Sequence, residues 1–535
     1  MKGTFVRRHH ALSAIFVVAI AIVAIMSVAA WGSKSKATAS SAGTFRGDYT
    51  ATVTTWDPSA SFSTEVAYMA NMYEPLLYSA APGSIKEFWP GLATSWSRTK
   101  DGLHWTFNLR KKVTFHDGTA FTAAAVKYSL ERTKKLNFAP AYLLAPIKKI
   151  VILNKYKVRF DLSYAAGLDR ILAGSSAAWI FSPKTATWKN WDSSAKEDGT
   201  GPWVLTSYKP NDTIKFKRYA KWWGGWKKSQ FSNIVVKIVS DGTTQQQDLT
   251  SGGTDYQTMV NRDQVKTLKK NKNVHVYVVK TWYNYIMAFN CKRAPLSNVA
   301  VRKALSYAVP YKSIITVGAG GYATQAKGPV PVGLWPNAKG KLPQYTYDLK
   351  KADKMLTAAG YPKAKRGKFN LKLTYAAENT FEKAFVPLIK GSFKKLGIKV
   401  TVNALLWNQQ YSNAIGSPSK RQDLFVVLWW PTLPDGHDNL ISLFQSEKTA
   451  AWNFSYWYNK TYDKTLAKAY KLSATSTKSS QKAYTTAMTQ LVTQAPAAYL
   501  FDSKTVVAYL KNIKIAWGAG NANYPTVLFW KYVGK

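Results

Sequence analysis

The chain has 535 residues, of which 46% are hydrophobic, enough for more than one well-packed core. Its single cysteine, Cys291, excludes an intramolecular disulfide and any cysteine-based metal site. A formal charge of +46, from 74 basic and 28 acidic residues, predicts attraction to polyanions. The lysines are spread along the chain and form no block or arginine-rich stripe, which argues against nucleic acid as a partner. We attribute the charge to the surroundings: anionic lipid, cell-wall polymer or an acidic exterior.

The first 30 residues have the order of an export signal. A basic segment, 1–10, precedes an uncharged apolar run over 11–30. This order is typical of a secretory signal, and the run is also long enough to cross a bilayer as an N-terminal anchor. Either alternative leaves the rest of the chain outside the cytoplasm. The polar segment 31–43 lacks apolar periodicity and is interpreted as a flexible tether. We therefore expect an extracytoplasmic, membrane-associated protein.

Strand and helix patterns are mixed in the first half of the remaining chain. Thr122 is placed to cap a helix over 123–135. Residues 155–163 alternate apolar and charged side chains, which predicts a half-buried strand. Segments 234–239 and 274–279 are rich in β-branched residues, which suits strands buried largely on both faces.

The second half continues the mixture. Asp348 precedes one amphipathic helix, and Asn379, with an acid three residues later, opens another that ends at Gly397. A strand over 398–402 follows at once, and helix, glycine, strand is an α/β arrangement. The apolar run 424–430 is too short to span a membrane and predicts a buried strand.

Signals of catalysis are almost absent. Apart from an adjacent pair near the N-terminus, no two of the six histidines have metal-ligand spacing, and no nucleophile elbow or zinc-protease motif is present. The segment 318–323 matches a dinucleotide fingerprint but lacks an acid about twenty residues later, so we interpret it as a loop. We expect no enzyme activity, no catalytic residue, no metal and no cofactor.

A series of motifs runs through nearly the whole chain after the tether. It includes 71–77 (NMYEPLL), 90–96 (PGLATSW), 101–107 (DGLHWTF), 109–122 (LRKKVTFHDGTAFT), 126–132, 199–203 (GTGPW), 219–224, 301–308 (VRKALSYA), 352–361 and 494–496. In this order the motifs resemble those of the family 5 extracellular solute-binding proteins, the peptide- and nickel-type receptors of ABC importers.

The resemblance implies a fold and a function. The fold would be a two-lobed α/β clamshell of the periplasmic-binding-protein type with an extra inserted domain. Lobe one would comprise 44–75, 195–290 and 500–535, the inserted domain 76–194, and lobe two 291–499. A monomer of this type would close about a hinge around a small solute, by default a short peptide, and deliver it to an ABC permease in the membrane.

Two departures from the family pattern matter. Trp31 stands where a lipoprotein signal carries the lipid-attached cysteine, so no thioether to lipid can form there. Leu433 stands where dipeptide-type receptors place the aspartate that holds a peptide's amino group. Asp435, two residues on, is then the candidate partner of a ligand amine, and Arg421 a speculative partner of a ligand carboxylate.

Aromatic residues are unusually abundant, with 21 Trp, 31 Tyr and 23 Phe. Most of them belong to cores, but some flank the expected cleft. A strand that delivers two adjacent tryptophans into a loop with acids could stack on a ligand and bind its cationic end. The others precede an expected hinge at 289–290, match a family position near the pocket, or lie in the segment that lines the cleft in relatives. The candidate ligand-binding residues are Trp56, Phe62, Trp282, Asn284, Tyr285, Trp407, Trp429, Trp430 and Asp435.

Alternatives to a peptide receptor remain open at this point. The tryptophans and Leu433 favour an oligosaccharide or another aromatic-stacked solute. The scarce histidines give a nickel ligand no positive support. A cell-wall-associated binding protein without a transport role would use the positive charge to bind wall polymer.

Overall fold

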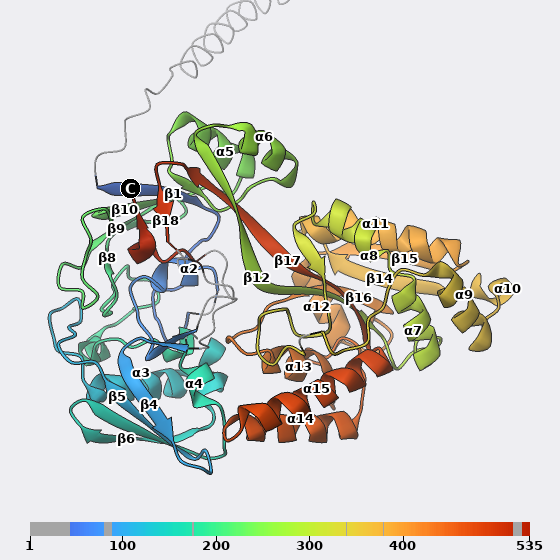
Figure 1. The fold of residues 1–535 in the computed structure, drawn as a ribbon, viewed down its shortest axis with the longest axis horizontal. Helices are drawn as coiled ribbons and strands as arrows, with labels where there is room; N and C mark the ends of the chain where they lie inside the picture. The colour runs from blue at the N-terminus through green and yellow to red at the C-terminus, as the bar shows by residue number, and fades with distance from the viewer. Residues whose placement is uncertain are drawn as a thin grey trace, which may run out of the picture.

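Two long antiparallel strands, β12 (Val274–Phe289) and β17 (Ala497–Leu510), pass through both halves of the molecule and join them (Figure 1). The computed structural model describes residues 43–61, 63–79, 88–173, 176–338, 340–377, 379–516, 520 and 527–535. An 11-stranded sheet extends to both sides of the long pair in the order β15-β14-β16-β12-β17-β11-β1-β10-β9-β8, with β13 (Ala323–Gln325) beside β17.

Lobe one contains the amino-terminal strand and the end of the chain. β1 lies between β10 and β11 in parallel register. The core includes Trp203 and Trp530, whose rings pack edge to face with centroids 6.2 Å apart. Asn71 accepts a hydrogen bond from the Trp530 amide at 3.0 Å, which ties the last residues to the first helix region. The elements are β1 (Thr44–Tyr49), α2 (Val66–Met69), β8 (Trp203–Lys209), β9 (Thr213–Arg218), β10 (Asn233–Ile238), α5 (Gly242–Ser251), β11 (Tyr256–Gln257), α6 (Val265–Lys270), β18 (Lys514–Ile515) and β19 (Val533–Gly534).

An inserted unit with its own four-stranded sheet, in the order β4-β5-β7-β6, lies below lobe one in Figure 1. Val126 and Leu130 of α3 pack on the sheet residues Phe107 and Phe160, which form the centre of a separate apolar cluster. The elements are β2 (Leu77–Ser79), β3 (Phe88–Pro90), β4 (Ala93–Arg98), β5 (His104–Leu109), α3 (Ala123–Leu136), β6 (Ile147–Asn154), β7 (Lys157–Leu162) and α4 (Leu168–Ile171).

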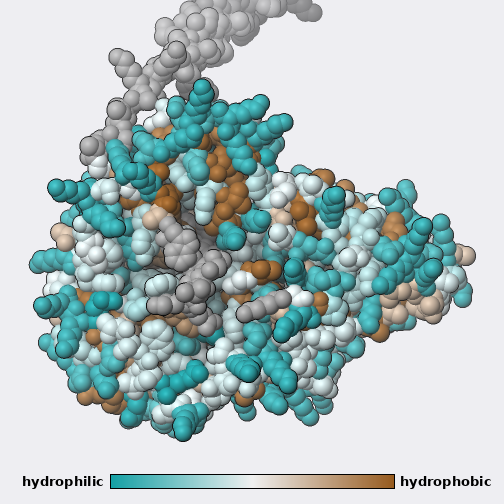
Figure 2. Space-filling model, in the orientation of Figure 1, coloured by the Kyte–Doolittle hydropathy of each residue, from teal (hydrophilic) through white to brown (hydrophobic). Residues whose placement is uncertain are grey.

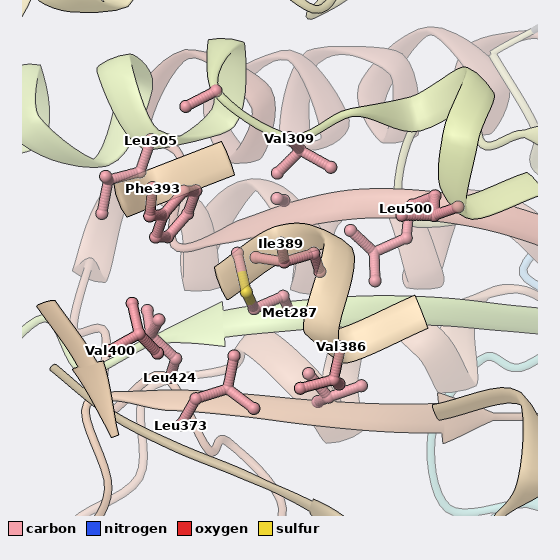
Figure 3. Packing of buried hydrophobic residues seen from close by; sticks show 14 of the residues in the cluster. Met287, Leu305, Val309, Leu373, Val386, Ile389, Phe393, Val400, Leu424 and Leu500 are labelled. Atoms are coloured by element: carbon pink, nitrogen blue, oxygen red, sulfur yellow. The ribbon is translucent and has the colours of Figure 1, made fainter. Parts of the chain in front are cut away.

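Lobe two is the α/β half of the molecule. Its parallel strands are covered on one face by α7, α9 and α11, whose apolar side chains interlock with Met287, Leu373 and Leu424 (Figure 3). A second cluster, on the other face, packs α12 to α15 against the sheet. The elements are α7 (Val299–Tyr307), α8 (Tyr311–Ser313), α9 (Leu349–Ala358), α10 (Lys363–Arg366), β14 (Asn370–Ala376), α11 (Thr380–Lys395), β15 (Lys399–Leu405), α12 (Trp407–Ile415), β16 (Leu424–Trp429), α13 (His437–Phe444), α14 (Lys460–Ser473) and α15 (Thr477–Gln494).

The strands and helices predicted from periodicity are present. α3 begins after Thr122, although the Thr122 side chain makes no capping hydrogen bond. Asn379 caps α11 by accepting from the amides of Phe381 and Glu382, but the Glu382 carboxylate turns to the amide of Ala376 and closes no capping box. Asn379 therefore sets the start of α11, and Glu382 joins the first turn of this helix to the end of β14.

Burial on both faces was predicted for two β-branched segments and is wrong for both. In segment 234–239, which forms most of β10, only Ile234 and Val236 are buried, and the other residues are half-buried. The β-branched segment 274–279 forms the first half of β12, but it is not buried on both faces, because this part of the sheet is covered on one side only. Tyr277, in the middle of the segment, is exposed. β-branched side chains favour a strand whether or not both of its faces are covered.

The predicted signal or anchor over 1–30 and the tether up to residue 42 lie outside the described residues. Within the described part of the chain, none of the helices combines the length and the apolar character needed to cross a bilayer. Hydrophilic side chains cover most of the face that Figure 2 displays, in keeping with the formal charge of +46.

The buried carboxyl group of Asp48 predicts a pH dependence of stability. Burial, together with the nearby Asp248, raises its pKa to about 7. An acid with a pKa higher in the folded state than in the unfolded state, where it is about 4, stabilises the fold when protonated. This contribution is complete below about pH 4, falls by at most about 1.4 kcal/mol per pH unit, and is lost above about pH 7.

We therefore expect denaturant titrations to give a larger free energy of unfolding at pH 5 than at pH 8. Asp48→Asn should flatten the dependence, whereas Asp263→Asn, which removes an exposed carboxyl group, should leave it unchanged. Equal pH profiles for the Asp48→Asn variant and the original chain would contradict the assignment.

Candidate ligand site between the lobes

The long strand pair has a break in its register where it passes from one lobe to the other. Pairing runs from Val274 with Leu510 to Lys280 with Lys504, and resumes at Asn284 with Asp502. Before the break β12 packs against helices of lobe one, and after it against the two clusters of lobe two. The break lies ahead of 289–290, where the sequence had suggested a hinge.

The carboxyl ends of three parallel strands of lobe two meet beside this break. β14 pairs in parallel with both β15 and β16, and Trp429 at the end of β16 is the register partner of Asn284. The connections α11 and α12 cover opposite faces of the sheet, since they belong to different apolar clusters. Ligands of open α/β sheets bind at the carboxyl edge where successive connections change sides. This edge is therefore the first candidate for a ligand site.

Aromatic rings gather at the carboxyl edge. Trp407 begins α12 directly after β15, and its ring lies 5.9 Å from that of Tyr411. Tyr411 is 4.9 Å from Trp452, which in turn is 5.5 Å from Trp429. Trp430 is 47% exposed. The sequence prediction thus brought Trp407 and Trp429 to one cluster, but it missed Tyr411 and the exposed Trp452, which lies in a loop with no distinctive motif.

The three predicted residues of β12 are buried at the break. Asn284 donates to the Asp502 carboxylate at 2.7 Å, and burial raises the pKa of Asp502 to about 6. Tyr285 is stacked between Phe381 and Phe501 in the core of lobe two. Among the described residues, neither Trp282 Nε1 nor Asn284 Oδ1 has a hydrogen-bond partner. Buried polar atoms without a described partner also occur in the core of lobe one, at Trp56 and Trp203, so these two atoms do not by themselves mark a ligand site.

The remaining predicted residues are placed elsewhere. Trp56 is buried in the core of lobe one, edge to face with Tyr208 at 5.0 Å. Phe62 lies outside the described residues. Arg421 precedes β16, at the strand end opposite Trp429, and donates to the carbonyl of Gly416. The six-residue strand β16 separates Arg421 from the carboxyl edge, so its pairing with a ligand carboxylate stays a prediction.

Asp435 already has a partner. Its Oδ2 lies 3.6 Å from Nε of Arg170, which belongs to α4 of the inserted unit, and its Oδ1 accepts from the amide of His437 at 2.8 Å. The guanidinium of Arg170 lies 3.6 Å from the centre of the Trp335 ring. The ion pair joins the inserted unit to lobe two, at the place where α4 approaches α13 and α14 in Figure 1. No sequence signal links these two residues, which are 265 positions apart.

A cavity of about 390 Å³ lies at this contact. Its walls come from the inserted unit (Tyr142, Leu143, Pro146, Tyr164, Gly167, Arg170 and Ile171) and from lobe two (Leu433, Asp435, His437, Asp438, Ile441, Gln445, Leu466, Ala467, Tyr470 and Lys471). The volume lies within the range of small-molecule sites, and boundaries between structural units are frequent locations for them.

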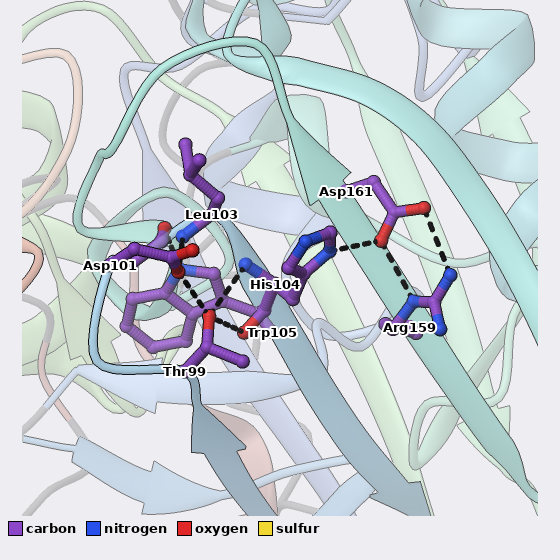
Figure 4. A network of polar contacts seen from close by, with 8 residues as sticks. Thr99, Asp101, Leu103, His104, Trp105, Arg159 and Asp161 are labelled. Carbon is purple, nitrogen blue, oxygen red and sulfur yellow. Dashed lines mark hydrogen bonds and ion pairs between the residues drawn. The ribbon is translucent and has the colours of Figure 1, made fainter.

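A polar network shapes a turn of the inserted unit that lies next to lobe two. In this turn, between β4 and β5, Asp101 accepts from Thr99 and from the amide of Leu103, and Trp105 donates to the carbonyl of Gly102 (Figure 4). Asp161 of β7 contacts both His104 of β5 and Arg159 of its own strand. The turn lies close to lobe two, because a Cβ added at Gly102 would lie 2.8 Å from Ala474.

Comparison with known proteins identifies the family. Residues 87–451 match the model of the bacterial extracellular solute-binding proteins, family 5 middle region. The heme-binding protein A of Haemophilus influenzae is 29% identical over 439 residues, covering 76% of this chain and 77% of that protein. The glutathione-binding protein GsiB of Escherichia coli is 28% identical over 434 residues, covering 80% and 83%.

Solved structures share the fold. The periplasmic binding protein DppA of Helicobacter pylori, in complex with the peptide STSA, has a TM-score of 0.74 at 24% identity over 92% of this chain and 98% of that one. The substrate-binding protein CtaP of Listeria monocytogenes has a TM-score of 0.80 at 18% identity over 92% and 99%. The two-lobed fold expected from the motifs is thereby confirmed.

Members of this family are extracytoplasmic transport components rather than enzymes. With more than half of its length matched, the chain belongs to the family 5 bacterial extracellular solute-binding proteins.

Proposed function

We propose that the protein captures a short peptide, or a solute of similar size, between its lobes and delivers it to an ABC permease. The carboxyl edge of lobe two supports the proposal, because an aromatic cluster and the orphaned groups of Trp282 and Asn284 lie there beside the register break. The peptide complex of the Helicobacter pylori protein supports the ligand class.

We propose a division into lobe one (44–75, 195–290 and 500–535), an inserted domain (76–194) and lobe two (291–499). The separate apolar clusters support three units, but they place the second half of β12, from Trp282 on, and Leu500 and Phe501 of β17 with lobe two. In this division β12 and β17 are the connections about which the lobes move, and their register break is the point of least hydrogen bonding. Closure about such strands would bring the aromatic cluster onto the solute.

Retention near the membrane is part of the proposal. The apolar run over 11–30 would serve as an uncleaved anchor, or the positive charge would hold a cleaved chain to anionic lipid or wall polymer. High salt screens the second contact and leaves the first in place, so a salt wash of isolated membranes separates the two.

A second candidate ligand is a solute held by ring stacking, such as an oligosaccharide. The rings of Tyr411, Trp429 and Trp452 favour it, because aromatic faces give apolar contact without charge, and Trp452 is exposed while the other two are partly buried.

Native mass spectrometry of protein purified from its source should reveal a bound solute that is released on denaturation. For the released solute, calorimetry is expected to show an affinity about three- to tenfold lower in Trp452→Ala, because a stacking surface is lost. Tyr277→Ala, which removes an exposed ring of β12 far from this cluster in sequence, is the control. Unaltered affinity in the Trp452 variant would exclude the aromatic cluster from the site.

Gly102 offers a test of lobe closure. It has φ +72°, and an added Cβ would meet Ala474 of lobe two at 2.8 Å. Gly118 has φ +86° with no atom within 4 Å of the same position, so it is a matched control for backbone strain. Both alanine variants should lose roughly 1 kcal/mol of stability from the left-handed backbone.

Only Gly102→Ala should also move the inserted domain away from lobe two. X-ray scattering would record this opening as a larger radius of gyration. A radius that is the same in both variants would mean that the turn does not limit closure.

A further inference from the structure

We propose that Arg170 is a built-in counter-ion that occupies the Asp435 carboxylate, so that the cavity between the inserted unit and lobe two admits a neutral or anionic group of the solute and rejects a cationic one. The inference rests on the proposed function, because it specifies the ligand chemistry of one part of the site between the lobes.

The cavity has the walls of a site for a ring or an apolar group. Tyr142 and Tyr164 from the inserted unit line it and are 56% and 43% exposed, so their rings are accessible to a ligand. Leu433 and Ile441 add apolar area from lobe two. Because the walls come from two units, a group bound here would contact both of them.

Two carboxylates line the cavity, and the protein supplies partners to both. Asp435 is engaged by Arg170 and by the amide of His437, as described above. Asp438 accepts from the amide of Thr432 at 3.1 Å and from the hydroxyl of Ser442 at 3.2 Å. A ligand ammonium would therefore compete with a protein donor at each acid, and at Asp435 it would also meet the positive charge of Arg170.

Displacement of Arg170 is expensive. Its side chain is 6% exposed and that of Asp435 is 4% exposed. The guanidinium also lies over the rings of Trp335, at 3.6 Å, and Phe88, at 5.4 Å. Loss of one partner from a buried ion pair leaves an unpaired charge, and a stacked guanidinium gives up its cation–π contacts as well.

Lys471, the one cationic side chain of the cavity lining that has no acid as its described partner, favours an anionic ligand group over a cationic one. Lys471 lines the cavity from α14, next to Tyr470, and is exposed to solvent. With both acids engaged, this ammonium makes the rim attractive to a carboxylate. The solute end that enters the cavity is then an uncharged ring, an apolar side chain or a carboxylate, and not a free amino group.

Three probes test the inference: 3-phenylpropionate, 2-phenylethanol and 2-phenylethylammonium. They share a phenylethyl group and differ in the charge of the group that it carries. Ligand-observed NMR with the full chain at pH 7 should show binding of the first two and roughly tenfold weaker binding of the ammonium. Leu433→Trp, which fills the cavity, should abolish binding of all three and so locate the probes there.

Two reciprocal variants change the charge of the cavity. Arg170→Met frees Asp435 and should reverse the order in favour of the ammonium. Asp435→Asn frees Arg170 and should strengthen binding of 3-phenylpropionate. Lys471→Gln should weaken the carboxylate only, and Lys468→Gln, on the same helix but outside the cavity, should change nothing.

The inference is overturned if no probe binds, if the ammonium binds the original chain as well as the carboxylate does, or if neither reciprocal variant has the effect expected of it. If Arg170→Met fails to fold, the Asp435→Asn result decides. Absence of a solute from the purified protein, combined with the expected probe order, would count against the proposed function and leave the inference standing.

Discussion

One hydrogen-bonded ladder carries the chain between the lobes, and the rest of the structure depends on it. β12 and β17 belong to the sheet of lobe one at one end and to the sheet of lobe two at the other. A continuous ladder would make the molecule a single stiff body, because its amides and carbonyls must remain paired. The interruption between Lys280 and Asn284, followed by a second register shift between Tyr285 and Ile286, relieves this constraint, and the aromatic edge of lobe two lies directly beside it.

Acidic residues are scarce in this protein and many of them are used inside it. Among the described residues, eleven acids are buried (Asp48, Asp57, Glu65, Glu74, Asp198, Asp255, Glu382, Asp423, Asp435, Asp438 and Asp502), against four basic residues (Arg170, Arg302, Arg366 and Lys531). Glu74, for example, accepts from Thr200, Tyr78 and Trp223. The solvent-facing surface is therefore more positive than the composition alone suggests, which strengthens its attraction to anionic surroundings.

Local patterns in the sequence predicted much of lobe two. The helix from Asn379, the left-handed Gly397 and the following strand are consecutive in the chain, so capping and periodicity suffice to recognise them. The same rules could not give the partner of Asp435, because Arg170 reaches it only after the inserted unit has packed against lobe two. The role of Trp452 could not be predicted either, because a single tryptophan in a loop belongs to no periodic pattern. Its neighbours in space, Tyr411 and Trp429, come from a helix and a strand far from it in the chain.

The hydrogen bond between Asn71 and Trp530 bears on the order in which the cores can form during folding. Lobe one joins segments 459 positions apart, and Trp530 is fully buried in its core. That core cannot be completed before the segment that carries Trp530 has been synthesised. Lobe two depends on a distant segment in the same way, because Leu500 and Phe501 of β17 belong to its core. The core of each half is therefore completed by segments that are synthesised after most of its other members.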